Sequence, residues 1–331
     1  MNKKSKGGPF NLVFLSDLVR WGKSVSLSQE IQTWATVLEG DVFNHYIPFS
    51  IYLLKSYDII MIELIPRALA MTKKIKRKYP NKKLIGVLEG SLHTLGNDLQ
   101  LKTSIEFIEA YRTVDALGVL IKDSIPYFQS ITNKPVFWLG VPFPVEWSRA
   151  HIIPPEKKEP IAEMLHTFCS GMGGLTNFFT LKEIQKLHPE AKGRSYSNKR
   201  KLDQALADRF GLNLEILPPL AWQKYFIRHS QAYLALHLDH RWTWNRYSLD
   251  CAAAGIPCIS TPHSTTHKML FPNLCVDPFD TKQAVVLAIR LLENPGFYKD
   301  CREYALEKIR FFDFENSAKR FTSFLSGQNI R

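Results

Sequence analysis

Short apolar segments rich in β-branched residues alternate with amphipathic helical segments along the whole chain, and this alternation limits its folds more than any other feature. It is typical of βαβ units, in which helices join parallel strands. In the first half we predict strands at residues 11–15, 58–63, 84–89, 115–121 and 136–139. All but the first consist largely of Ile, Val, Leu or Phe, as expected of strands covered on both faces. The sequence therefore predicts an α/β protein.

A proline-rich segment, residues 141–160, interrupts this alternation. It contains five prolines and several charges, and no helical or strand periodicity continues through it. We interpret it as a linker and place a domain boundary near residue 150, which gives domains of residues 1–150 and 151–331. The length of 331 residues agrees with two domains, because a typical domain has roughly 150.

The alternation restarts after the linker and predicts a second α/β domain of similar size. We predict strands at residues 164–169, 214–217, 232–236 and 257–260, and helices at residues 177–187, 222–229 and 246–254, with another opened by Asp280. The last segment, residues 298–324, is helical in pattern and rich in aromatic residues. It carries more apolar surface than a free tail would, so it should dock on one domain or bridge both.

The chain is basic. It has 43 Lys and Arg against 31 Asp and Glu, a net charge of +12, which favours nucleic acid, acidic lipid headgroups or phosphorylated substrates as partners. Residues 72–83 concentrate seven of these basic residues. They form either a solvated helix end or a patch for anionic lipid or a nucleic-acid backbone. Few aromatic residues lie among them, so sequence-specific reading of single strands is not expected.

Several features bear on cellular location. The five cysteines show no paired spacing, so neither a disulfide framework nor a zinc site is indicated. The N-terminal apolar stretch is cut by charges, and no apolar run reaches the roughly 20 residues that span a bilayer. We therefore expect a cytoplasmic protein, and peripheral contact with the inner face of an anionic membrane stays open.

Two segments of the second half are candidates for nucleotide binding. Residues 170–179 (SGMGGLTNFF) form a glycine cluster between a predicted strand and a predicted helix, where backbone amides can face a diphosphate. The cluster matches neither the P-loop nor the dinucleotide fingerprint, and a tight turn alone would give the same pattern. Residues 241–262 contain LDCAAAGIPCIST, which predicts a small-residue helix end, a glycine stop and a buried strand.

The order of strand, glycine loop, helix and LDCAAAGIPCIST resembles the C-terminal half of GT-B glycosyltransferases. It is most similar to the retaining group 1 family (glycosyltransferase family 4), whose pattern is E-x7-E followed by A-x-A-x-G-x-P-V, and residues 249–260 carry most of the match. Residues 115–124 and 134–143 are similar to strand-and-turn segments before and at that family's domain junction. The resemblance implies two Rossmann-like domains facing across a cleft, with a C-terminal helix that crosses back to the first.

The resemblance also implies how the donor is bound. Asp250 takes the place of the second Glu of the pattern, which holds the ribose hydroxyls of the nucleotide. The glycine loop matches the stretch that faces the donor diphosphate. The further residues expected to contact the donor are Gly171, Gly173, Gly174, Asn245 and Tyr247.

In this family an Arg and a Lys neutralise the diphosphate leaving group, because negative charge builds up on it as the glycosidic bond breaks. Arg246, within the motif helix, is the preferred candidate for this catalytic role. Arg194, Lys199 and Arg200 are the alternatives, and they could equally be solvated residues of a surface loop. No DxD motif is present, so the nucleotide-sugar is expected to act as a co-substrate without a metal or another cofactor.

The chain departs from the family pattern at one position. The first Glu of E-x7-E falls on Trp242, so the usual contact to the donor sugar is missing. Asp239 or His240 are candidates to replace it from a shifted loop. The departure also supports an alternative in which the chain is a non-catalytic nucleotide- or nucleic-acid-binding protein derived from a GT-B fold.

The acceptor is expected on the first domain. Glu89 and His93 follow the strand at residues 84–89, and Asp17 follows the first strand, at the strand ends where α/β proteins gather ligands. Each could orient an acceptor hydroxyl or act as a base, and each could equally cap a helix. The predicted function is hexosyl or pentosyl transfer to a hydroxyl of a saccharide, a lipid-linked glycan or modified DNA, the last of which suits the net charge.

Overall fold

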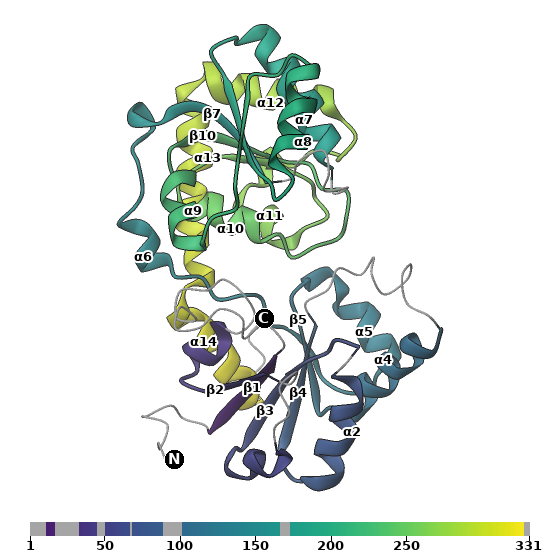
Figure 1. Cartoon of the computed structure of the whole chain (residues 1–331). Helices are drawn as coiled ribbons and strands as arrows, with labels where there is room; N and C mark the ends of the chain where they lie inside the picture. The colour runs from purple at the N-terminus through teal and green to yellow at the C-terminus, as the bar shows by residue number, and fades with distance from the viewer. Residues whose placement is uncertain are drawn as a thin grey trace. The chain divides into compact units, whose positions relative to one another are not determined.

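The computed structural model describes residues 11–16, 33–44, 50–66, 68–88, 101–165 and 173–327. These residues form two compact units (Figure 1). The first consists of the described parts of Met1–Pro144 and Phe312–Arg331, and the second is Val145–Phe311. The chain thus changes unit between Pro144 and Val145, slightly before the predicted boundary near residue 150, and its last segment returns to the first unit.

The described residues of the first unit form a parallel sheet in the order β2-β1-β3-β4-β5-β6. Its strands are β1 (Leu12–Ser16), β2 (Asp41–Asn44), β3 (Ile59–Glu63), β4 (Lys83–Leu88), β5 (Ala116–Val119) and β6 (Val136–Trp138). Its helices are α1 (Thr33–Val37), η2 (Ile51–Ser56), α2 (Leu69–Lys78), α4 (Leu101–Thr113), η3 (Lys122–Ser124), α5 (Ile125–Ile131) and α14 (Phe314–Leu325). The five predicted strands are confirmed, and only β2 was not predicted.

The core of the first unit follows from the alternation of side chains along its strands. Val13 and Ile60 face one side, where they pack with Ile75 of α2, Tyr111 of α4 and Phe128 of α5. This side of the sheet carries α2, α4 and α5 in Figure 1.

The other side of the sheet receives the aromatic C-terminal helix. The ring of Phe321 lies 5.7 Å from that of Trp34 in α1, and Phe324 stacks on Phe137 at 3.6 Å. Phe321 is only 1% exposed, so α14 belongs to the core of the first unit. The predicted docking of this segment, and the return of a C-terminal helix to the first domain, are confirmed.

The described residues of the second unit form a parallel sheet in the order β11-β10-β7-β8-β9. Its strands are β7 (Glu159–Met164), β8 (Lys192–Tyr196), β9 (Leu214–Leu217), β10 (Ala232–His237) and β11 (Cys258–Ser260). Its helices are α6 (Val145–Arg149), η4 (Pro155–Lys157), α7 (Gly174–Leu187), α8 (Arg200–Arg209), α9 (Trp222–His229), α10 (Arg246–Ala253), α11 (Thr265–Leu270), η6 (Pro272–Leu274), α12 (Thr281–Glu293) and α13 (Pro295–Lys308). The short helix η7 (Ile309–Phe312) begins in this unit and ends at the first residue that returns to the first unit. Both units are therefore doubly wound α/β structures, and the predicted fold class is confirmed.

Two predictions in the second unit are wrong. The strand predicted at residues 164–169 is β7, which ends at Met164 and begins inside the segment interpreted as a linker. Pro160 does not prevent this, because it stands at the exposed start of the strand, where a ladder hydrogen bond is not required. The segment around Arg194, considered as a surface loop, is the strand β8.

The described residues contain no helix long and apolar enough to cross a membrane. They also contain no group of three His, Cys, Asp or Glu side chains placed to hold a metal ion. Four cysteines in this part of the chain are free thiols: Cys251, Cys258, Cys275 and Cys301.

Candidate functional site

The second sheet has a topological switch point between β7 and β10. The chain runs from β7 outward through β8 to β9, then returns to the other side of β7 with β10 and β11. The strand order therefore reverses beside β7, and α/β proteins bind ligands outside the carboxyl ends of the strands at such a point. Most of the residues predicted to bind the donor lie at this edge.

Gly173 lies in close contact with the residue that follows β10. It is the N-cap of α7 and has a φ of 80°, in the left-handed region. A Cβ atom here would lie 2.0 Å from the carbonyl oxygen of Leu238, directly after β10, so no other residue fits. The fully buried Asn177 of α7 accepts a hydrogen bond of 2.9 Å from the Leu238 amide through Oδ1. The N-terminus of α7, with Gly174 as its first residue, is thereby fixed at the switch point.

A second helix N-terminus lies at the same edge. Asn245 caps α10 from a left-handed conformation, with a φ of 57°, and its Oδ1 accepts from the Ser248 amide at 3.1 Å. Its Nδ2 donates to Ser260 Oγ at 3.2 Å, and that hydroxyl donates to the carbonyl oxygen of His237 at 2.7 Å. These bonds tie α10 to the ends of β10 and β11. Two helix N-termini then present positive dipole ends at one sheet edge, which favours an anion such as a diphosphate.

The first turns of α10 carry the other predicted donor residues. Arg246 is half-buried at its first position. Asp250 is 2% exposed, and its Oδ1 accepts a hydrogen bond of 2.9 Å from the indole Nε1 of Trp222, the first residue of α9. Tyr247 is buried between the rings of His229 and His237, each 5.4 Å away, and burial raises the pKa of its hydroxyl well above the ordinary value. Its phenol is therefore neutral, and it acts as part of the packing under α10.

The loop after β10 holds the residues around the departure from the family pattern. Asp239 is 3% exposed and bonds in a bidentate manner to Arg241, with a closest separation of 2.7 Å. Trp242 is 39% exposed and stacks on His263 at 5.1 Å. His240 stacks on Phe279 at 6.2 Å. An exposed indole thus occupies the position of the family's first Glu, and the Asp239 carboxylate is engaged by its own loop.

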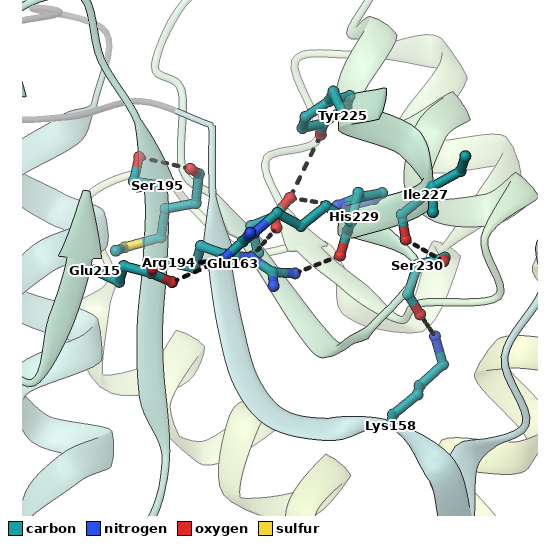
Figure 2. Close-up of polar contacts among 11 residues, drawn as sticks. Lys158, Glu163, Arg194, Ser195, Glu215, Tyr225, Ile227, His229 and Ser230 are labelled. Atoms are coloured by element: carbon teal, nitrogen blue, oxygen red, sulfur yellow. Dashed lines mark hydrogen bonds and ion pairs between the residues drawn. The ribbon is translucent and has the colours of Figure 1, made fainter. Parts of the chain in front are cut away.

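Arg194 lies in a different environment from the other donor candidates. It is 1% exposed, and its Nε donates to Glu163 Oε2 at 2.7 Å while Nη2 donates to the carbonyl oxygen of Arg228 at 2.8 Å. His229 Nδ1 bonds to the other Glu163 oxygen, which also accepts from the Tyr225 hydroxyl at 3.5 Å, so Figure 2 shows Glu163 among three partners. Burial alone would raise the pKa of Glu163, but the interactions with His229 and Arg194 hold it below the ordinary value. These contacts give Arg194 a structural role, and donor binding by Arg194 stays a prediction.

The remaining predicted residues form two groups, one exposed at α8 and one outside the described residues. Lys199 and Arg200 are exposed at the start of α8, just beyond the carboxyl end of β8. Four others lie outside the described residues: Asp17, Glu89, His93 and Gly171.

The first sheet has its own switch point, between β1 and β3. Here Ser16 Oγ donates a hydrogen bond of 2.7 Å to Glu63 Oε2, and both residues are buried at the ends of their strands. Sequence reasoning did not single out this pair. The signal that could have found it is a carboxylate at the end of the otherwise apolar strand IIMIE.

Sequence reasoning also missed residues of the second unit. Asn177 and Trp222 make the contacts that fix Leu238 and Asp250. Asn177 was visible as a polar residue one turn into the helix after the glycine cluster. Trp222 gave no signal, because its partner is almost thirty residues further along the chain.

Comparison with known proteins extends this picture. No protein-family model matches the chain, and no curated protein matches it. Among solved structures it is similar to an α,α-trehalose-6-phosphate synthase from Burkholderia multivorans, with a TM-score of 0.73, 10% identity and coverage of 96% of this chain and 98% of that one. It is similar to Anabaena HepE in complex with UDP and glucose, with a TM-score of 0.74, 11% identity and coverage of 96% and 100%.

A third similar structure is a trehalose-6-phosphate protein from E. coli bound to UDP-2-fluoroglucose, with a TM-score of 0.68, 13% identity and coverage of 85% of this chain and 75% of that one. The first two of these structures share one architecture with the chain along nearly its whole length. The chain therefore has the GT-B fold of glycosyltransferases, as the motif order implied.

Proposed function

We propose that this chain is a glycosyltransferase that takes a sugar from a nucleotide-sugar donor bound at the carboxyl edge of the second sheet. The observation that carries the proposal is the convergence, at one switch point, of the Gly173 turn, the Asn245-capped N-terminus of α10 and the Asp250 carboxylate. The solved structures similar to this chain include one in complex with UDP and glucose and one bound to UDP-2-fluoroglucose. UDP-glucose is therefore the first donor to test.

Each group has a defined task in this proposal. The N-termini of α7 and α10 bind the diphosphate, because the first backbone amides of a helix point outward at its positive dipole end. Asp250 accepts hydrogen bonds from the ribose hydroxyls. Arg246, at the first position of α10, supplies the positive charge that stabilises the departing nucleoside diphosphate as the glycosidic bond breaks. Asn245 and Tyr247 act by holding α10 in place.

The acceptor is proposed to bind at the carboxyl edge of the first sheet. Asp17 and Glu89 directly follow β1 and β4 in the sequence, and His93 follows shortly after. The net charge of +12 suits a phosphorylated saccharide as the acceptor. A lipid-linked glycan, modified DNA, contact with an anionic membrane and the absence of a metal or cofactor requirement stay predictions.

A binding panel tests the donor site. UDP, GDP, ADP, CMP and UDP-glucose are titrated calorimetrically into the wild type and into Asp250→Ala. We expect binding of one nucleotide class by the wild type, and an affinity at least tenfold lower in the variant, since a hydrogen bond to a charged group contributes about 1.5–3 kcal/mol. Asp300→Ala, an exposed acid on α13, is the matched control and should bind like the wild type. If no nucleotide binds the wild type, or if Asp250→Ala binds normally, the proposed site is wrong.

A second function is favoured by one observation, the exposed indole of Trp242 at the position of a family Glu. A chain lacking the usual contact to the donor sugar could bind nucleotide without transferring a sugar. Release of UDP from UDP-glucose in the presence of candidate acceptors distinguishes the two functions. UDP binding at the Asp250 site without release, across saccharide and sugar-phosphate acceptors, would favour the binding protein.

A further inference from the structure

Asp250 is held by a side chain from another helix. The indole Nε1 of Trp222 donates to Asp250 Oδ1 at 2.9 Å. Because Asp250 is only 2% exposed, its carboxylate depends on such donors to offset the loss of water. An indole N–H can only donate and a carboxylate can only accept, so this contact restricts the rotation of the carboxylate.

The position of Trp222 is set by the anchoring of α9 at its other end. His229 bonds to Glu163 of β7, and Arg194 of β8 donates to the carbonyl oxygen of Arg228 at 2.8 Å (Figure 2). These contacts involve side chains that are nearly inaccessible to water. The C-terminal turn of α9 is therefore attached to two central strands, and the helix has little freedom to move along the sheet.

Aromatic packing fixes the N-terminal turn of α9. The Trp222 ring lies 5.5 Å from Phe226, one turn further along α9, and 5.0 Å from Trp147 of α6. Phe226 is fully buried, so it anchors the indole to the core. The indole N–H is consequently aimed at Asp250 by contacts that do not involve Asp250 itself.

We propose that Trp222 is a positioning residue that orients the Asp250 carboxylate toward the ribose hydroxyls of the donor. This inference rests on the proposed function, in which Asp250 binds the ribose. A carboxylate has about four acceptor sites, and the indole occupies one of them on Oδ1. Because the indole holds the carboxylate before the donor arrives, less entropy is lost in ordering the side chain when Asp250 accepts from the ribose hydroxyls.

The test compares ligands with and without the ribose hydroxyls. UDP and 2′,3′-dideoxy-UDP are titrated into the wild type and into Trp222→Phe, which keeps an aromatic ring against Phe226 and removes the N–H. We expect UDP affinity to fall about tenfold and affinity for the dideoxy compound to change less than twofold, so that discrimination between the two is largely lost. Trp222→His, which retains a ring N–H, should restore part of this discrimination.

Trp138→Phe is the matched control, since it removes an indole N–H of the first unit that donates to the carbonyl oxygen of Leu120 at 3.1 Å. It should leave both affinities within twofold of the wild type. Equal losses of UDP and dideoxy-UDP affinity in Trp222→Phe, or none, would overturn the positioning role while leaving the donor site intact, provided that Asp250→Ala still abolishes UDP binding. Failure of the wild type to bind any nucleotide would instead overturn the proposed function and this inference together.

Discussion

The buried carboxylate of Glu163 provides the sharpest test of how the second unit is held together. Glu163 and Arg194 are 0% and 1% exposed, and the carboxylate bonds to both Arg194 and His229. Glu163→Gln keeps the shape of the side chain and removes its charge, so the Arg194 guanidinium is left buried without its counter-ion. Breaking a buried pair on one side costs about 3–5 kcal/mol.

Urea unfolding followed by fluorescence measures this cost. We expect the transition of the second unit to move to lower urea, while the transition of the first unit stays in place, because Glu163 lies within the second sheet. Glu159→Gln, an exposed acid at the start of the same strand, is the matched control and should change the free energy of unfolding by less than about 0.5 kcal/mol.

A double variant separates charge from packing. Replacing Glu163 and Arg194 together by Met removes both charges, and a buried ion pair exchanged for apolar residues of similar volume is often neutral in stability. The double variant should therefore be more stable than Glu163→Gln. A cost below about 1 kcal/mol for Glu163→Gln, or a double variant less stable than the single one, would refute this account of the buried pair.

Two further predictions concern pH and the switch point. His267 is fully buried and burial lowers its pKa to about 4, so the unfolded state, with a pKa near 6.5, binds more protons between these values. Stability should fall by about 3 kcal/mol as the pH falls from 6.5 to 4, and His267→Gln should flatten this dependence in urea unfolding. Gly173→Ala should destabilise the chain more than Gly211→Ala, because both have positive φ but only Gly173 would place a Cβ against Leu238. Equal melting temperatures for the two glycine variants would contradict the close approach of Gly173 to Leu238.

The strands that the sequence predicted are those whose own residues are apolar. β3 (IIMIE) and β4 (KLIGVL) were recognised because their side chains are buried on both faces. β8 (KGRSY) was not, because its buried side chains include a guanidinium. That charge is tolerated inside only because Glu163 comes from the neighbouring strand. A pattern within one segment cannot show a partner supplied by another, so Arg194 was considered as a surface residue.

The proposed donor residues were singled out because they lie together in one segment. Asn245 caps α10, and Arg246 and Asp250 lie within that helix, which is followed by an unusual run of small residues. Their partners come from other elements: Ser260 from β11 and Trp222 from α9. Those contacts depend on the order of strands in the sheet, which no local spacing encodes.

The small-residue run itself links packing to the proposed site. Ala252, Ala253 and Ala254 are at most 2% exposed, and α10 is surrounded by α6, α11 and α13. At Gly255, with a φ of 61°, a Cβ atom would lie 3.0 Å from Arg302 of α13. Larger side chains would push α10 away from these neighbours and carry Asn245 and Asp250 with it. The AAAG run therefore needs no contact with a ligand. It determines where Asn245 and Asp250 are placed, and this explains why packing residues and proposed binding residues lie in a single motif.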